Sequence, residues 1–271
     1  MTIENDDDLR NLLRIGRICG EALQHMLAHV EPGMTTAQLD AIGAEFVQRQ
    51  GARSAPILAY KFPGFTCISL NDEAAHGIPG ERVIQAGDLV NVDVSAELEG
   101  YWADTAATMI VPPARPQAER LCRFTRRALD EAIGVVRAGR PLNTIGKTVE
   151  RIARKGGYAI IRELPGHGVG RSLHEKPSVP NFYHRQDRTI MHEGMVFTIE
   201  PFFSAGSGRI FTDRDGWTLR TCLLYTSDAA DDLLCVDLGG RRIIKKKIIS
   251  PTLQLSTILI CIILKINMKL L

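Results

Sequence analysis

Two carboxylates lie in apolar stretches of the chain, where a charged side chain needs a compensating partner. Asp93 interrupts the run Val90-Asn-Val-Asp-Val94, and Glu200 ends the run Met195-Val-Phe-Thr-Ile-Glu200. Both runs are rich in residues that favour β-strands. Burial of a carboxylate in such a strand is costly unless a charge compensates for it, and a bound metal ion commonly does so. These two positions therefore predict metal ligands.

Two further side chains complete a candidate ligand set. Asp104 lies on the strand expected to return after the turn Glu97-Leu-Glu-Gly100, so its side chain can face Asp93 across the ladder. Carboxylates that close repel each other unless cations lie between them; a pair that faces solvent is the alternative. His167 stands in Pro165-Gly-His-Gly-Val-Gly170, where we expect the glycines to allow unusual backbone angles. Three carboxylates and one imidazole are typical ligands of paired Mn, Fe, Co or Zn ions that activate a shared water.

Two more histidines stand beside turn residues, His76 in Ala75-His-Gly-Ile-Pro79 and His174 in Leu173-His-Glu-Lys-Pro177. An imidazole in such a position can donate a hydrogen bond to a substrate. We expect that role for both, and loop histidines without a role are the alternative.

The first part of the chain contains two helices and then several strands that would position these residues. Apolar residues recur at helical spacing over 9–30, and we expect this helix to stop at Gly33. The capping box Thr35-x-x-Gln38 opens a second helix, which we expect to end at Gly51. Strands are predicted at 65–70, 88–96 and 102–111, the last two as a hairpin.

The same pattern then repeats. Apolar spacing predicts a helix over 121–136 that stops at Gly139, and Asn143 is expected to cap another helix that ends at Gly157. The glycines after the helices, Gly33 and Gly139 as well as Gly51 and Gly157, are each 106 residues apart.

The carboxylate-bearing strands repeat as well. Residues 87–93 align with 194–200 at an offset of 107, so that Asp93 and Glu200 coincide. We interpret this as an internal duplication that brings the two carboxylates to equivalent places on one central sheet. Chance similarity between two amphipathic helix pairs is the alternative.

The composition is that of an ordinary globular protein, with 45% hydrophobic and 24% charged residues among 271. A net charge of +2 gives no sign of a nucleic-acid partner. The acidic start lacks the features of a signal peptide, and the apolar stretch 253–264 is too short to span a membrane. The six cysteines show no paired spacing, which favours free thiols in a reducing compartment. We therefore expect a cytoplasmic protein that binds neither nucleic acid nor a membrane.

Six motifs over roughly residues 5–221 resemble the type I methionine aminopeptidases in order and spacing. They are Asn71-Asp-Glu-Ala-Ala-His-Gly-Ile-Pro79, Val90-Asn-Val-Asp-Val94, Trp102-Ala-Asp-Thr-Ala106, Pro165-Gly-His-Gly-Val-Gly-Arg171, His174-Glu-x-Pro177 and Glu193-Gly-Met-Val-Phe-Thr-Ile-Glu-Pro201. The resemblance implies an α+β fold, the pita-bread fold of creatinases and aminopeptidases. In that fold, two pseudo-symmetric helix–helix–sheet halves surround a curved antiparallel sheet, in agreement with the duplication.

The resemblance also implies the ligands and the catalytic chemistry. Asp93, Asp104, His167 and Glu200 resemble the ligands of two divalent cations (Co, Mn, Fe or Zn), with Asp104 bridging both ions. Glu200 matches the residue thought to move the proton of the bridging water. The implied activity is removal of the initiator methionine from nascent proteins with a small second residue, by attack of a metal-bridging hydroxide.

The resemblance implies substrate contacts too. His76 matches the histidine that contacts the scissile peptide, and His174 matches the one that steadies the tetrahedral intermediate. Leu173 stands where the family usually has an aromatic residue, so one wall of the pocket is expected to differ. The methionine side-chain pocket is expected to be formed by Phe62, Cys67 and Trp217.

The expected partner is the N-terminus of a nascent polypeptide at the ribosome, and we expect a monomer. Two alternatives remain open. One is another pita-bread peptidase, of the X-Pro aminopeptidase or prolidase type; those usually carry a large extra N-terminal domain, whereas only about 60 residues precede the sheet here. The other is a non-catalytic pita-bread binding protein, which would have lost ligands throughout the site.

The chain departs from the family after residue 221. The family has a fifth ligand, a second bridging Glu on a late strand, but no Glu follows Glu200 in this sequence. We interpret 1–221 as the pita-bread domain without its last strand or strands, and 222–271 as a disordered, non-native tail read through from a sequencing adapter. A genuine divergent tail is the alternative. Asp237 is the nearest substitute ligand, in unsuitable Gly- and Arg-rich surroundings. We expect an exposed sheet edge and impaired activity in this chain.

Overall fold

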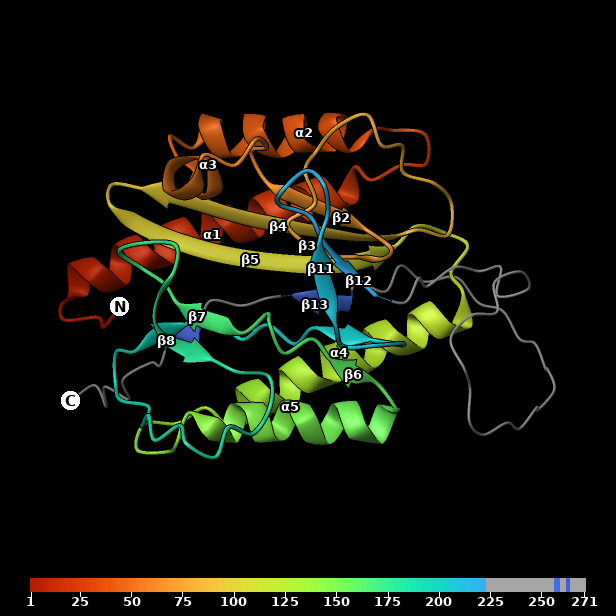
Figure 1. The fold of residues 1–271 in the computed structure, drawn as a ribbon. Coiled ribbons are helices and arrows are strands. Elements are labelled where there is room, and N and C mark those ends of the chain that lie inside the picture. Colours follow the sequence, from red (N-terminus) through yellow and green to blue (C-terminus); the bar gives the residue numbers. More distant parts are fainter. Residues whose placement is uncertain (223–255, 259–261, 264–271) are drawn as a thin grey trace.

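The computed structural model describes residues 1–222, 256–258 and 262–263. Two pairs of helices lie on opposite sides of the strands (Figure 1). The first part of the chain forms α1 (Asp6–Ala28), α2 (Thr36–Arg49), β1 (Arg53–Ser54), α3 (Ala55–Tyr60), β2 (Cys67–Leu70), β3 (Glu73–Ala75), β4 (Leu89–Leu98) and β5 (Tyr101–Ile110). The second part forms α4 (Pro116–Gly134), α5 (Asn143–Gly156), β6 (Ala159–Ile160), β7 (Gly166–Gly168), β8 (Glu175–Val179), β9 (Val196–Phe197), β10 (Phe203–Ser204), β11 (Ile210–Thr212) and β12 (Leu219–Thr221).

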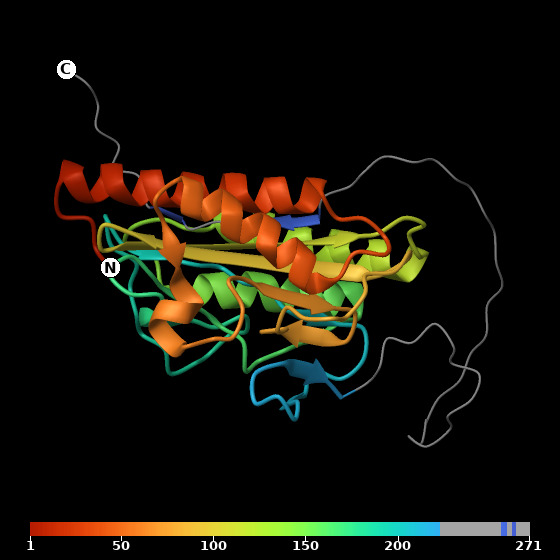
Figure 2. The ribbon, with the colours of Figure 1, turned by 90° about the horizontal axis from the view of Figure 1, so that it is seen from above.

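The long helix α1 covers the hairpin of β4 and β5 (Figure 2). Asn5 caps its start by accepting a hydrogen bond from the backbone N–H of Asp8. Its apolar face packs with both strands in one core, in which Ile15 and Met26 are fully buried. Truncation of a buried side chain such as Ile15 to Ala would cost roughly 2–5 kcal/mol of stability.

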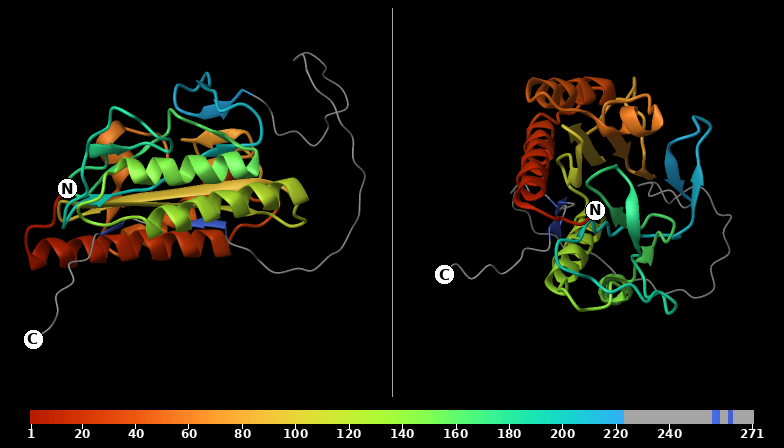
Figure 3. Two further views of the ribbon diagram at one scale, coloured as in Figure 1. Left: turned by 90° about the horizontal axis from the view of Figure 1, so that it is seen from below. Right: turned by 90° about the vertical axis from the view of Figure 1, so that its left-hand side faces the viewer.

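The second helix pair, α4 and α5, lies on the opposite side of the strands and packs into a core of its own with β9 (Figure 3). Fully buried side chains of this core include Leu129, Ile145, Ile152 and Phe197. Each half of the chain thus supplies most of one hydrophobic core, although Val169 and Val196 of the second half pack into the first core.

The predicted duplication is also visible in the backbone. Gly33 donates its N–H to the carbonyl of Ile84, and Gly139 donates its N–H to the carbonyl of Met191. All three aligned glycine pairs have positive φ: Gly33 and Gly139, Gly51 and Gly157, Gly87 and Gly194. The prediction that Gly33 and Gly139 stop their helices was wrong, because α1 ends at Ala28 and α4 at Gly134. Each glycine instead shapes a connection that pairs with a later segment.

Asn143 does not cap α5, contrary to our prediction. The helix begins at this residue, and no side chain caps its start. Asn143 is buried; its amide nitrogen donates to the carbonyl of His184 at 2.7 Å, and its amide oxygen accepts from the N–H of the same residue at 2.8 Å. The side chain therefore fastens the loop after β8. The capping box of Thr35 and Gln38 on α2 is present as predicted.

The hairpin of β4 and β5 fixes where two candidate ligands lie. Glu99 and Gly100 have φ values of 52° and 83°, which suits a tight two-residue turn between paired Leu98 and Tyr101. In this register Asp93 lies opposite Ala106, and Asp104 lies opposite Ser95. The two carboxylates are therefore diagonal neighbours on one face of the ladder and not a directly opposed pair.

The strand 65–70 predicted from sequence is shorter in the structure. Asp40 of α2 accepts hydrogen bonds from the backbone N–H groups of Phe65 and Thr66, at 3.0 and 2.7 Å. These two residues are thereby held against α2, and the ladder of β2 with β4 begins at Cys67.

Two short strands from the end of the chain lie against the domain. β13 (Ser256–Ile258) pairs with β5 at Ala107 and Thr108, and β14 (Ile262–Ile263) pairs with β9. The expected bare edge is thus not found along this part of β5. The other residues of the predicted tail lie outside the described part of the chain. Among the described residues, no helix has the length and apolar character needed to cross a membrane.

Candidate metal centre

Four elements bring the predicted ligands together. Asp93 and Asp104 lie on β4 and β5, His167 on β7, and Glu200 three residues after the end of β9. The His167 Nε2 atom lies 3.3 Å from Asp104 Oδ2 and 3.1 Å from Glu200 Oε1. One ligand atom from each of Asp104, His167 and Glu200 fits within 4.8 Å of the others. This is the spacing expected of side chains that share a cation.

Asp93 adjoins this group. Burial, the charge of Asp104 and a hydrogen bond with Asp104 raise the pKa of Asp93 well above its usual value. Asp93 Oδ1 and Asp104 Oδ1 are buried and, within the described residues, have no hydrogen-bond partner. An unsatisfied buried acceptor costs about 1–3 kcal/mol. Two such oxygens beside an imidazole and a third carboxylate fit a divalent cation, which would satisfy them.

The imidazole of His167 is oriented for metal binding. Its Nδ1 atom lies 3.0 Å from the carbonyl oxygen of Gly168, so Nδ1 carries a proton and Nε2 faces the carboxylates. Burial disfavours the charged imidazole, but hydrogen bonds to Asp104 and Glu200 outweigh it and raise the pKa of His167 to about 11. The hydrogen bond from His167 in turn lowers the pKa of Asp104 despite burial. Without a metal ion, the protonated imidazole of His167 supplies positive charge next to the carboxylates of Asp104 and Glu200.

The glycines beside His167 serve a different purpose from the one predicted. Neither Gly166 nor Gly168 has a positive φ. A Cβ atom at Gly166 would overlap the carbonyl oxygen of Thr198, and one at Gly168 would overlap that of Lys176. These glycines allow neighbouring backbone to approach β7 closely.

Thr198 is a supporting residue that the sequence analysis missed. Its hydroxyl accepts a hydrogen bond from the backbone N–H of His167 at 2.9 Å and donates one to Glu200 Oε1 at 2.5 Å. One side chain thus positions two candidate ligands, His167 on β7 and Glu200 in the segment after β9. Its place two residues before Glu200, on the same side of an extended chain, was the available signal.

The two candidate substrate histidines lie beside the candidate metal ligands. The ring centroid of His174 lies 4.0 Å from that of His167. Burial, together with the charge of His167, lowers the pKa of His174 to about 4. Burial also lowers the pKa of His76, although Asp104 opposes this change. Both imidazoles are therefore neutral near pH 7, and each has one N–H group to donate.

Of the predicted methionine-pocket residues, Phe62 and Trp217 meet edge to face, with ring centroids 5.3 Å apart. Cys67 is buried and pairs with Asp93 across the ladder. Burial and the negative charge of Asp93 raise the pKa of this thiol well above its ordinary value, so it stays neutral. Leu173 is buried. The wall formed by Phe62 and Trp217 is apolar, as a methionine side chain would require.

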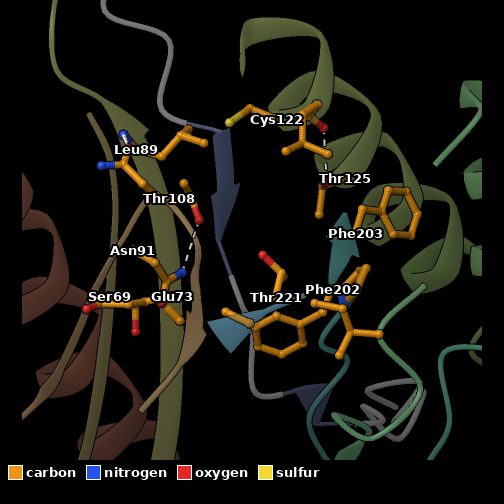
Figure 4. A pocket seen from close by; sticks show the side chains of 16 residues that line it. Ser69, Glu73, Leu89, Asn91, Thr108, Cys122, Thr125, Phe202, Phe203 and Thr221 are labelled. Carbon is orange, nitrogen blue, oxygen red and sulfur yellow. Dashed lines mark hydrogen bonds between the residues drawn. The ribbon is translucent and has the colours of Figure 1, made fainter. Parts of the chain in front are cut away.

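No carboxylate reaches the centre from the described strands of the chain's end, β13 and β14, which consist of Ser, Thr and Ile. Asp237 lies outside the described residues. A cavity lies between the two halves and is lined by side chains from both of them (Figure 4). Its polar side includes Asn91, which donates to Thr108 Oγ1 at 3.0 Å, and its other side includes Cys122 and Phe203. None of the four candidate ligands lines it, so the candidate chemistry lies elsewhere.

Comparisons with known proteins identify the family of this chain. The sequence matches Metallopeptidase family M24 over residues 10–243. It is 42% identical to methionine aminopeptidase 2 of Bacillus subtilis over 82% of this chain and 90% of the relative. It is 36% identical to methionine aminopeptidase of Escherichia coli K12 over 82% and 84%.

Solved structures give the same result. The crystal structure of methionine aminopeptidase from Rickettsia prowazekii superposes with a TM-score of 0.78 at 35% identity, over 82% of this chain and 90% of that one. Prolidase from Pyrococcus furiosus has the same fold, with a TM-score of 0.66 at 23% identity over 74% and 57%. Together with the two pseudo-symmetric halves, these matches confirm the predicted pita-bread fold. The chain belongs to metallopeptidase family M24.

Proposed function

We propose that this chain is a methionine aminopeptidase that removes the initiator methionine from nascent proteins with a small second residue. The observation that carries the proposal is the convergence of Asp93, Asp104, His167 and Glu200, with two buried carboxylate oxygens that have no hydrogen-bond partner among the described residues. The names of the relatives at 36–42% identity support the same activity. We further propose that it acts in the cytoplasm, as a monomer, on chains that emerge from the ribosome.

The four ligand residues would hold a pair of divalent cations, of Co, Mn, Fe or Zn. When bound, such ions bring the pKa of a water close to neutrality and polarise a carbonyl oxygen. Glu200 is suited to move a proton, because the Thr198 hydroxyl holds one of its carboxylate oxygens in place. The neutral imidazoles of His76 and His174 would donate hydrogen bonds to the peptide, and one donor aimed at a developing oxyanion supplies about 3 kcal/mol.

The side chain of the substrate would lie against Phe62, Cys67 and Trp217. An aromatic edge-to-face pair presents a rigid apolar surface that suits an unbranched thioether. We propose that this surface selects methionine at the first position.

We also propose that this particular chain is impaired, because the family's second bridging Glu is absent from its sequence. The test is cleavage of Met-Gly-x and x-Pro peptides after loading with Mn²⁺ or Co²⁺. The full chain is compared with residues 1–221 joined to the corresponding C-terminal residues of the Bacillus subtilis relative.

We expect fast cleavage of Met-Gly-x by the chimera and slow cleavage by the full chain. Equal rates would contradict the impairment. A chimera that binds metal but cleaves only x-Pro peptides would identify a prolidase-type enzyme. A chimera that binds no metal would identify a non-catalytic protein.

A further inference from the structure

The side chain of Tyr60 joins the two halves of the molecule beside the metal centre. Tyr60 is the last residue of α3 in the first half, and His174 directly precedes β8 in the second half (Figure 1). The Tyr60 hydroxyl oxygen lies 2.6 Å from His174 Nδ1, and the ring centroids are 5.5 Å apart. The His174 ring also packs against the ring of His167, with the two ring centroids 4.0 Å apart.

Local structure holds Tyr60 in this position. The hydroxyl of Ser54 caps α3 by accepting from the N–H of Ile57, and it donates to the carbonyl of Phe65 at 2.7 Å. Lys61 ends the helix in the left-handed conformation, with φ 58°, and buried Phe62 follows. Tyr60 is thus anchored by its neighbours on both sides in the chain, although the residue itself is 46% exposed.

A turn holds His174 as well. Glu175 Oε1 accepts hydrogen bonds from the backbone N–H groups of Arg171 and Ser172, at 2.5 and 2.7 Å. The hydroxyl of Ser172 donates to the carbonyl of His174 at 3.2 Å. The backbone around the imidazole is therefore closed into a compact turn, and the Tyr60 contact meets a ring whose position is already set.

The partner of Nδ1 decides which nitrogen of a neutral imidazole carries the proton. At His167, Nδ1 meets a carbonyl oxygen, which can only accept, so Nε2 is left as the atom that can bind a cation. At His174, Nδ1 meets a phenol, which can donate. If Tyr60 donates, the proton of His174 is on Nε2, and that nitrogen is a hydrogen-bond donor.

We propose that Tyr60 is a positioning residue that donates its hydroxyl proton to His174 Nδ1 and so holds His174 in the Nε2–H tautomer. Two adjacent imidazoles, with ring planes tilted by 45°, then have opposite roles, one as a ligand and one as a donor. A role for this N–H donor at a developing oxyanion rests on the proposed function. The assignment of the tautomer is independent of that function, and it can be measured in a chain that has no activity.

The test is NMR of the full chain labelled with ¹⁵N-histidine, with and without Zn²⁺. Long-range ¹H–¹⁵N correlations show which ring nitrogen is protonated, and His174→Gln assigns the signals. We expect Nε2–H for His174 in the wild-type chain and a mixture of both tautomers in Tyr60→Phe. Tyr183→Phe, another exposed tyrosine, is the matched control and should leave the spectrum unchanged. The signals of the remaining histidines report whether each variant is folded.

Protonation of His174 at Nδ1 in the wild-type chain would overturn the proposal, as would an unchanged His174 tautomer in Tyr60→Phe. In the cleavage assay, loss of one neutral hydrogen bond predicts a fall in kcat of about two- to tenfold with KM little changed. A change in KM alone would show that Tyr60 acts in binding and would also overturn the proposal. Failure of the wild-type chain and the chimera to cleave any peptide would contradict the proposed function only, since the tautomer is decided by NMR.

Discussion

Replacement of Thr198 by Val would test whether the candidate ligands His167 and Glu200 depend on the hydrogen bonds of the Thr198 hydroxyl. Valine keeps the shape of threonine but lacks the hydroxyl. The variant loses the hydrogen bond to the Glu200 carboxylate, and it leaves the buried backbone N–H of His167 without its acceptor. A hydrogen bond to a charged group contributes about 1.5–3 kcal/mol, and an unsatisfied buried N–H costs about 1–3 kcal/mol. We therefore expect a loss of about 3 kcal/mol in the free energy of unfolding.

Two measurements check this expectation. For a domain of this size, 1 kcal/mol corresponds to about 2–4 °C in Tm, so the variant should melt about 6–12 °C lower. Calorimetric titration should show a 10- to 100-fold weaker affinity for Mn²⁺, roughly the effect of losing an outer hydrogen bond to a ligand.

The matched control is Thr148→Val, a buried threonine of α5 whose hydroxyl donates to the carbonyl of Thr144 at 2.8 Å. This bond is local to the helix and remote from the ligands, so the control should lose only about 1 kcal/mol and keep its affinity for Mn²⁺. An affinity of Thr198→Val within twofold of the wild-type value would refute the assigned role, whatever happens to Tm.

Three further outcomes are expected. Asp93→Asn should raise the Tm of the metal-free chain, because it removes a buried carboxylate whose pKa is raised by burial, and it should weaken Mn²⁺ binding at least about 100-fold; a lower metal-free Tm would contradict this. Because folding raises the pKa of His167 from 6.5 to about 11, its stabilisation of the metal-free chain is complete below about pH 6.5 and is lost towards pH 11. Denaturant unfolding should show that decline, and His167→Gln should flatten it. Gly168→Ala should lower stability by more than about 3 kcal/mol, because its methyl group would overlap the carbonyl of Lys176. Gly134→Ala, which meets no neighbour within 4 Å, is its control in the same thermal melts.

The repeated features of the fold were predictable from sequence because each repeat carries local signals. Apolar spacing and the capping box of Thr35 and Gln38 identified helices, and the aligned glycines identified equivalent backbone positions. The helix ends were less predictable. Gly33 and Gly139 were interpreted as helix stops, but their N–H groups donate to carbonyl groups some fifty residues away. The spacing of residues along the chain does not indicate such long-range hydrogen bonds.

Some residues of the candidate site were likewise predictable from sequence, and others were not. Carboxylates within apolar stretches of the sequence made Asp93 and Glu200 candidates, since burial of charge is a local anomaly. The roles of Thr198 and Tyr60 depend on contacts across strands or between halves, and threonine and tyrosine are common enough that neither is anomalous in sequence. The diagonal placement of Asp93 and Asp104 follows from where the turn at Glu99 falls, which the residue types alone leave open by a position or two.

The division of the candidate ligands between the two halves has a consequence for how the molecule unfolds. Asp93 and Asp104 come from strands of the first half of the chain, whereas His167 and Glu200 come from the second half. A shared ion would thus act as a non-covalent cross-link, and its binding free energy would couple the unfolding of one repeat to that of its twin. Chelation would remove this link and leave only the direct contacts between the halves, such as the ion pair of Arg171 with Asp8, to couple their unfolding.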